Sequence, residues 1–155
     1  KSVLDASTAW TPAVNLFVAL DTALQMMKEE GLDNIWKRHA RIASAIRAGV
    51  KAIGLELLVK DEKVASNAIT AVLPPEGISV PDIRKTIKKD FDIVVANGQK
   101  ELKDKIFRIG NLGFVSDRDA ITAIGSLEAS LYKLGYKFEL GAGVAAVIKT
   151  LAEKA

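Results

Sequence analysis

A single arginine stands in the apolar stretch IFRIG at residues 106–110. Arginine is almost never buried without a partner, so Arg108 needs a chemical reason to be there. Side chains alternate along a strand, which places Ile106, Arg108 and Gly110 on one face and Phe107 and Ile109 on the other. A guanidinium that leaves one face of a sheet can hold a carboxylate through two parallel hydrogen bonds, a geometry that lysine cannot reproduce.

The residue types alone leave other interpretations of this segment open. The guanidinium could pair with Glu101 or Asp104, or reach solvent at a sheet edge. Gly110 and Gly113 suit either an ordinary turn or a backbone that passes close to a ligand. The sequence ANGQ at 96–99 is typical of either a flexible loop near a substrate or a plain hairpin-like turn.

A second candidate position lies at the start of a long apolar segment that ends at Gly31. Thr11 followed by Pro12 predicts a helix with Thr11 as its N-cap and Pro12 at its first position. A helix N-terminus offers unpaired N–H groups and a partial positive charge, so the same place suits a phosphate. This segment is apolar nearly all round, which predicts that the helix is covered from more than one side.

The helices and strands expected around these residues indicate an α+β fold: a small, mostly antiparallel sheet covered by helices. A second helix is expected after Asp33 or Asn34, ending near Gly54. The other expected elements are strands at 55–60, 67–75, 92–98 and 106–110, a helix over 79–91 capped by Ser79, a helix opened by Ser116 and Asp119 and ending at Gly135, and a final helix over roughly 143–153.

Composition narrows the function classes. The chain has 155 residues, 49% hydrophobic and 26% charged, which is typical of one globular domain. Without cysteine and with one histidine, neither a disulfide framework nor a clustered metal site is expected, and His39 is interpreted as a core or interface histidine. Apolar runs are too short for a bilayer, and a net charge of +3 does not by itself indicate nucleic acid. We therefore expect a cytoplasmic protein with no metal, membrane or nucleic-acid partner.

Two segments carry a resemblance to a known family: TPAVNLFVALDTALQMMKEEGLDNIWKRH at 11–39 and FDIVVANGQKELKDKIFRIGNLGFVSDRD at 91–119. They resemble the C-terminal part of class V, fold type I, pyridoxal-phosphate aminotransferases of the alanine–glyoxylate and serine–glyoxylate group. This group includes members labelled soluble hydrogenase small or tritium-exchange subunit. The resemblance implies that residues 1–10 are an inter-domain segment and that 11–155 form the C-terminal small domain, while a larger N-terminal domain holds the cofactor and the Schiff-base lysine.

The resemblance also implies residue roles. Arg108 would hold the substrate carboxylate, and Thr11 and Thr8 would reach the phosphate of pyridoxal 5′-phosphate bound by the neighbouring subunit of a homodimer. The reaction implied is amino transfer from a small amino acid, alanine or serine, to a 2-oxo acid such as glyoxylate or pyruvate. The chain alone, with no catalytic residue of its own, would be inactive. Relatives often carry tyrosine at the position of Thr8, histidine at Asn111 and glycine at Asp104.

Two other functions remain open at this point. One is a non-catalytic binding or interaction module that uses a basic surface or an exposed apolar helix face. The other is the small domain of a cysteine-desulfurase or phosphonate-transaminase relative, which shares the architecture and differs in substrate. Salt-dependent binding of an acidic partner by a monomer would favour the module, whereas self-association through the apolar helix would favour the fragment of an enzyme.

Overall fold

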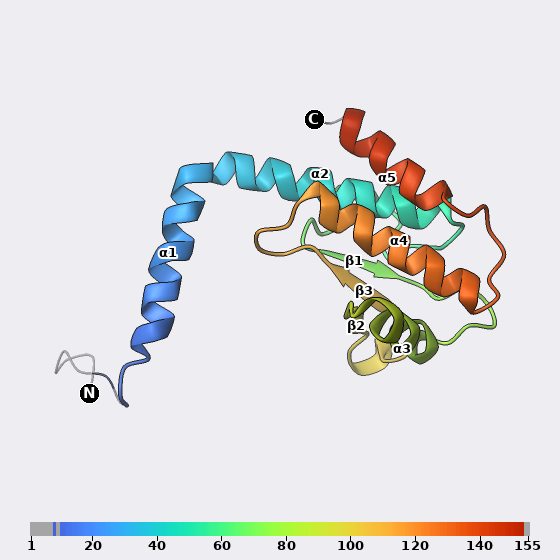
Figure 1. The fold of residues 1–155 in the computed structure, drawn as a ribbon, viewed down its shortest axis with the longest axis horizontal. Coiled ribbons are helices and arrows are strands. Elements are labelled where there is room, and N and C mark those ends of the chain that lie inside the picture. Colours follow the sequence, from blue (N-terminus) through green and yellow to red (C-terminus); the bar gives the residue numbers. More distant parts are fainter. Residues whose placement is uncertain (1–7, 9, 154–155) are drawn as a thin grey trace. The chain divides into compact units, whose positions relative to one another are not determined.

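The computed structural model describes residue 8 and residues 10–153 (Figure 1). The chain divides into two compact units, residues 1–37 and residues 38–155, and each is described by itself. The inter-domain segment predicted at residues 1–10 falls almost entirely outside the described residues. The elements are α1 (Val14–Glu30), α2 (Leu32–Ala52), β1 (Ile69–Val72), α3 (Val80–Phe91), β2 (Ala96–Asn97), β3 (Phe107–Gly110), α4 (Asp117–Lys133) and α5 (Ala142–Glu153), with 3₁₀ turns at Glu62–Val64 and Lys100–Leu102.

The larger unit is built on a three-stranded antiparallel sheet in the order β1-β3-β2. Phe107 and Ile109 of β3 point into the hydrophobic core, where Phe107 is fully buried. The same core contains side chains from α2, α3, α4 and α5, so these helices cover one face of the sheet (Figure 1). The predicted α+β fold with a small antiparallel sheet covered by helices is therefore confirmed.

Close helix packing in this unit depends on two glycines. A Cβ atom added at Gly49 of α2 would lie 2.8 Å from Val147 of α5 and 3.0 Å from Ile124 of α4. At Gly143 of α5, a Cβ would lie 2.8 Å from the Glu128 carboxylate. That buried carboxylate accepts hydrogen bonds from the backbone N–H groups of Gly143, at 2.6 Å, and Gly141, at 3.2 Å. A carboxylate of α4 thus satisfies the start of α5, where helical N–H groups lack partners.

The predicted caps of α3 and α4 are confirmed. The Ser79 hydroxyl accepts a hydrogen bond from the Asp82 N–H at the start of α3. At the start of α4, the Ser116 N–H and hydroxyl donate to the Asp119 carboxylate at 2.7 and 2.8 Å. These bonds, the backbone one first, lower the pKa of Asp119 because they stabilise its charged form. The capping pattern in the sequence therefore fixed both helix starts correctly.

The start of α1 differs from the prediction. The helix begins at Val14 with Ala13 as its N-cap, and no side chain caps it, so Thr11 is not the N-cap and Pro12 is not helical. The reason is local: the Val14 N–H donates to the carbonyl of Pro12 at 2.9 Å, which turns the chain before the helical bonding begins. No residue of α1 is buried, and most of its apolar side chains, Phe17 among them, are exposed.

Two further expectations were wrong in detail. Gly31 has a φ of 83°, and the N–H of Asn34 bonds to its carbonyl, so α2 starts at Leu32 and neither Asp33 nor Asn34 is its cap. The stretch 55–60 is not a strand: Leu57 forms one isolated bridge with Val72, and the chain then turns into the 3₁₀ segment at 62–64. The strands expected at 67–75 and 92–98 form over four and two residues.

None of the described helices is long and apolar enough to span a bilayer.

Candidate functional site

Arg108 lies on the face of the sheet opposite the core. It is half-buried, and its directly opposed residues are Ala71 on β1 and Ala96 on β2. Gly110, two residues further along β3, is exposed, and a Cβ placed there would meet nothing within 4 Å. The residues directly opposite Arg108 are thus small, whereas the larger Ile69, opposite Gly110, and Ile106 share its face of the sheet.

The guanidinium of Arg108 is anchored at one nitrogen only. Its Nε–H donates to the backbone carbonyl of Asn97 at 2.8 Å. Within the described residues, Arg108 makes no ion pair, and neither Glu101 nor Asp104 pairs with it. Both terminal nitrogens, Nη1 and Nη2, therefore have no partner from the described part of the chain. The alternative in which Arg108 is satisfied by a neighbouring acid is wrong.

The loop between β2 and β3 places the carbonyl that anchors Arg108. The side chain of Asn97 donates to the Asp104 carboxylate at 2.6 Å and accepts from the Asp104 N–H at 3.0 Å. Asp104 has a φ of 59°, the left-handed region that favours glycine, which accounts for the glycine expected there in relatives. Gly98 packs directly on the carbonyl of Leu102, to which an added Cβ would approach within 1.9 Å. The ANGQ segment at 96–99 therefore begins a loop that is held by the Asn97–Asp104 hydrogen bonds and by the contact of Gly98 with Leu102.

The segment after β3 is held by α2. His39 is half-buried, and its Nδ1 bonds to the backbone carbonyl of Asn111 at 2.8 Å, which fits the structural role predicted for it. The buried Asn111 side chain donates to the carbonyl of Asn67 at 2.6 Å. Arg38 donates to the carbonyls of Gly113 and Val115 at 3.2 and 2.9 Å. These contacts fix the chain just beyond the strand that carries Arg108.

Thr8 and Thr11 belong to the smaller unit, and Arg108 belongs to the larger one. Both threonines are exposed, and the Thr8 hydroxyl donates to the carbonyl of Trp10 at 2.5 Å. An open hollow of about 490 Å³ lies at the N-terminus of α1, lined by residues 12–16. The first turn of α1 has no acidic residue, and no side chain caps it. A helix N-terminus with no side-chain cap and no acidic residue in its first turn suits a phosphate, so the start of α1 fits the phosphate of pyridoxal 5′-phosphate.

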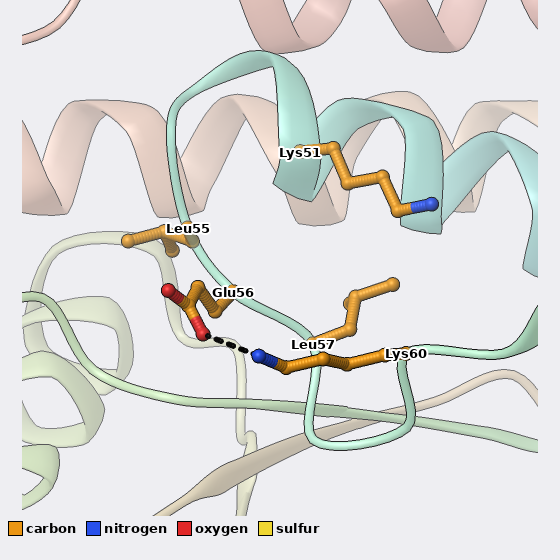
Figure 2. A pocket seen from close by; sticks show the side chains of 5 residues that line it. All are labelled: Lys51, Leu55, Glu56, Leu57 and Lys60. Carbon is orange, nitrogen blue, oxygen red and sulfur yellow. Dashed lines mark ion pairs between the residues drawn. The ribbon is translucent and has the colours of Figure 1, made fainter.

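A hollow in the larger unit contains two lysines and could in principle offer a nucleophilic amine. It measures about 260 Å³ and is lined by Lys51, Leu55, Glu56, Leu57 and Lys60 (Figure 2). Lys60 pairs with Glu56 at 3.6 Å and its side chain is 82% exposed, whereas Lys51 pairs with Glu62. Nucleophilic lysines are activated by desolvation in an apolar pocket or by a neighbouring cation that no carboxylate neutralises, whereas Lys51 and Lys60 are both exposed and both paired with a carboxylate.

Known proteins match almost the whole chain. It is 52% identical over 97% of its length to the soluble hydrogenase small subunit of a Synechococcus species, of which it covers 39%. It is 36% identical over 94% of its length to the serine–glyoxylate aminotransferase of Hyphomicrobium methylovorum, of which it covers 36%. The structure is similar to that of pyridoxamine–pyruvate aminotransferase from Mesorhizobium loti, with a TM-score of 0.89 and 33% identity over 94% of this chain and 38% of that one.

No protein-family model matches the chain. The chain spans less than two fifths of the length of these curated relatives. Its fold, with the small antiparallel sheet and its covering helices, is that of aminotransferase C-terminal domains. By sequence and by fold, the chain therefore belongs to the class V pyridoxal-phosphate-dependent aminotransferases and corresponds to their C-terminal part.

Proposed function

We propose that this chain is the substrate-carboxylate-binding domain of an aminotransferase that moves an amino group from alanine or serine to a 2-oxo acid such as glyoxylate or pyruvate. One observation carries the proposal. Arg108 is held at Nε by the backbone carbonyl of Asn97, while Nη1 and Nη2 stand unpaired within the described residues, on the face of the sheet opposite the core. Charge-assisted hydrogen bonds to a carboxylate would satisfy both nitrogens.

Both substrates of this reaction carry a carboxylate next to the reacting carbon, so one arginine could bind the substrate in both half-reactions. Arg108 would bind and orient that carboxylate through two parallel N–H···O bonds, which fixes the substrate in position and in rotation. Pyridoxal phosphate supplies the aldehyde chemistry that carries the amino group. The enzymes named serine–glyoxylate aminotransferase and pyridoxamine–pyruvate transaminase among the relatives support a small amino or oxo acid as substrate.

Thr11 and Thr8 would contact the cofactor phosphate of a second copy of the enzyme, so the functional unit we propose is a homodimer. The uncapped start of α1 and the hollow beside it support this assignment. The exposed apolar side chains of α1 support a helix that is covered in the whole enzyme, by its own large domain and by the second copy. Two sets of apolar neighbours would account for a helix that is apolar nearly all round.

The chain alone should not form a covalent adduct with the cofactor. Incubating it with pyridoxal phosphate and then with borohydride should label surface lysines weakly and at random, and no transaminase turnover should appear. The reason is that neither lysine of the hollow at residues 51–60 has the desolvated surroundings of an activated amine. Stoichiometric labelling of one lysine together with turnover, measured by peptide mass spectrometry and alanine–glyoxylate assay, would overturn the proposed division of labour.

Thr11→Val should weaken cofactor retention in the full-length enzyme while leaving its fold intact. The hydroxyl lost is exposed and caps no helix, so its removal should cost little stability. The loss of one hydrogen bond to the charged phosphate, about 1.5–3 kcal/mol, should raise the cofactor Kd about tenfold or more. Dialysis followed by absorbance of bound cofactor measures the effect. Thr22→Val, which removes an exposed hydroxyl from the middle of α1, is the control and should retain cofactor normally.

A further inference from the structure

We infer that Asn97 is a positioning residue that makes Arg108 present its terminal nitrogens end-on to the substrate carboxylate. The inference rests on the proposed function of Arg108. A guanidinium can hold a carboxylate either through Nε and one terminal nitrogen or through Nη1 and Nη2. Because Nε–H is already donated to the carbonyl of Asn97 at 2.8 Å, only the Nη1–Nη2 edge is left for a ligand.

The position of that carbonyl is set by the register of the sheet. Ala96 is opposite Arg108, and Asn97 is opposite Phe107. The next residue, Gly98, donates its N–H to the carbonyl of Ile106 at 3.0 Å, so β2 stays paired with the chain up to the point where the loop begins. β2 has only two residues, so strand pairing alone holds the Asn97 carbonyl weakly.

The side chain of Asn97 supplies the missing support. It accepts from the backbone N–H of Asp104 at 3.0 Å and donates to the carboxylate of Asp104 at 2.6 Å. The first bond needs only a backbone N–H and survives with any residue except proline at 104. The second bond needs an acceptor side chain at position 104, which Asp104 supplies and a glycine would not. The Asn97 side chain therefore links the two ends of the loop, while its carbonyl accepts from Arg108.

This arrangement makes Asn97 a determinant of carboxylate selectivity. Two parallel N–H···O bonds require two acceptor oxygens, and a primary carboxamide offers only one. An Arg108 guanidinium fixed with its Nη1–Nη2 edge towards the ligand should discriminate against the amide more strongly than a guanidinium that can rotate. The ratio of kcat/KM for alanine to that for alaninamide therefore reports on how well Arg108 is held, and a general loss of folded enzyme does not change it.

The experiment uses the full-length enzyme with alanine, alaninamide and glyoxylate. Asn97→Ala should raise KM for alanine about fivefold to tenfold, the range expected for losing neutral and charged hydrogen bonds around a binding group, with kcat changed less than twofold. The alanine-to-alaninamide ratio should fall by a similar factor. Asp104→Gly should change KM by less than threefold, since the bond from the backbone N–H of residue 104 remains.

Exchanging the residue types at positions 97 and 104 should restore the contact between their side chains. Asn97→Asp alone places a second carboxylate beside Asp104, and the repulsion should raise KM as Asn97→Ala does. Adding Asp104→Asn restores a donor and an acceptor in exchanged positions, and KM should return to within twofold of the wild-type value. Thermal unfolding of each variant is recorded alongside, so that the rescue can be read as repositioning rather than refolding.

The outcomes distinguish the role of Asn97 from that of Arg108. Raised KM in Asn97→Asp that returns in the double variant supports the inference. An unchanged KM and ratio in both Asn97→Ala and Asn97→Asp overturns the inference, while the proposed function stands if Arg108→Ala still raises KM. If Arg108→Ala leaves KM for alanine unchanged, the proposed function itself fails, and the inference fails with it.

Discussion

Replacing Arg108 by alanine in the full-length enzyme should lower kcat/KM at least about a hundredfold for the amino acid and for the oxo acid alike, because each lost charge-assisted bond is worth about 1.5–3 kcal/mol. The effect should appear mainly in KM if the clamp holds substrate and transition state equally. Under the proposed role, Arg108 would bind the carboxylate of both substrates, so kcat/KM for both should fall together. Steady-state kinetics with each substrate varied in turn measures this.

Arg108→Lys separates the contribution of the positive charge from that of the planar guanidinium. Lysine keeps the charge but has no planar fork, so it should recover only part of the loss and should still bind the carboxylate poorly. Arg118→Ala is the matched control, since Arg118 is an exposed arginine in the first turn of α4. Kinetic constants that stay at wild-type values in Arg108→Ala would remove this residue from the substrate site.

Gly98→Ala should destabilise the chain by about 2–3 kcal/mol, the upper part of the range for forcing extra atoms into a packed site. The new Cβ would lie 1.9 Å from the carbonyl oxygen of Leu102 and 3.0 Å from the side chain of Ile106. The carbonyl belongs to the 3₁₀ turn Lys100–Leu102 and also accepts the N–H of Lys105 at 3.0 Å, so it cannot yield without opening the loop. Denaturant unfolding of the chain measures the free energy.

Gly110→Ala is the control for this substitution. It lies in the same sheet, its φ is not positive, and an added Cβ meets nothing within 4 Å. Alanine there should be neutral or slightly stabilising, because it reduces the freedom of the unfolded chain. Equal destabilisation by the two substitutions would show that strand propensity, rather than the contact with Leu102, determines the cost at Gly98.

Local patterns predicted much of the fold. The spacing of apolar residues and the side-chain caps at Ser79 and Ser116 located α3 and α4, and the alternation in IFRIG identified the core face of β3. These features depend on residues close together in the sequence. The start of α1 was missed because Thr11 and Pro12 fit a capping pattern, while the backbone turns once more, at Pro12 and Ala13, before the helix begins.

The surroundings of Arg108 could not be predicted, because they depend on which segments are brought together by folding. The bond from its Nε to the Asn97 carbonyl spans eleven residues, and the bonds of Arg38 to the loop after β3 span more than seventy. The acceptors are backbone carbonyls, which no residue pattern reveals. The short sequence distance favours an ion pair of Arg108 with Glu101 or Asp104. The carboxylate of Asp104 instead accepts a hydrogen bond from the side chain of Asn97.

The acceptor that holds Arg108 Nε does not depend on the residue type at position 97. It is a main-chain oxygen, which every amino acid at position 97 would provide, so a substitution at 97 can shift this acceptor but cannot remove it. The residues directly opposite Arg108, Ala71 and Ala96, are small, and a Cβ added at Gly110 would meet nothing within 4 Å. Under the role proposed for Arg108, substitutions at these three positions would change the range of acids accepted without removing the main-chain oxygen that holds Nε.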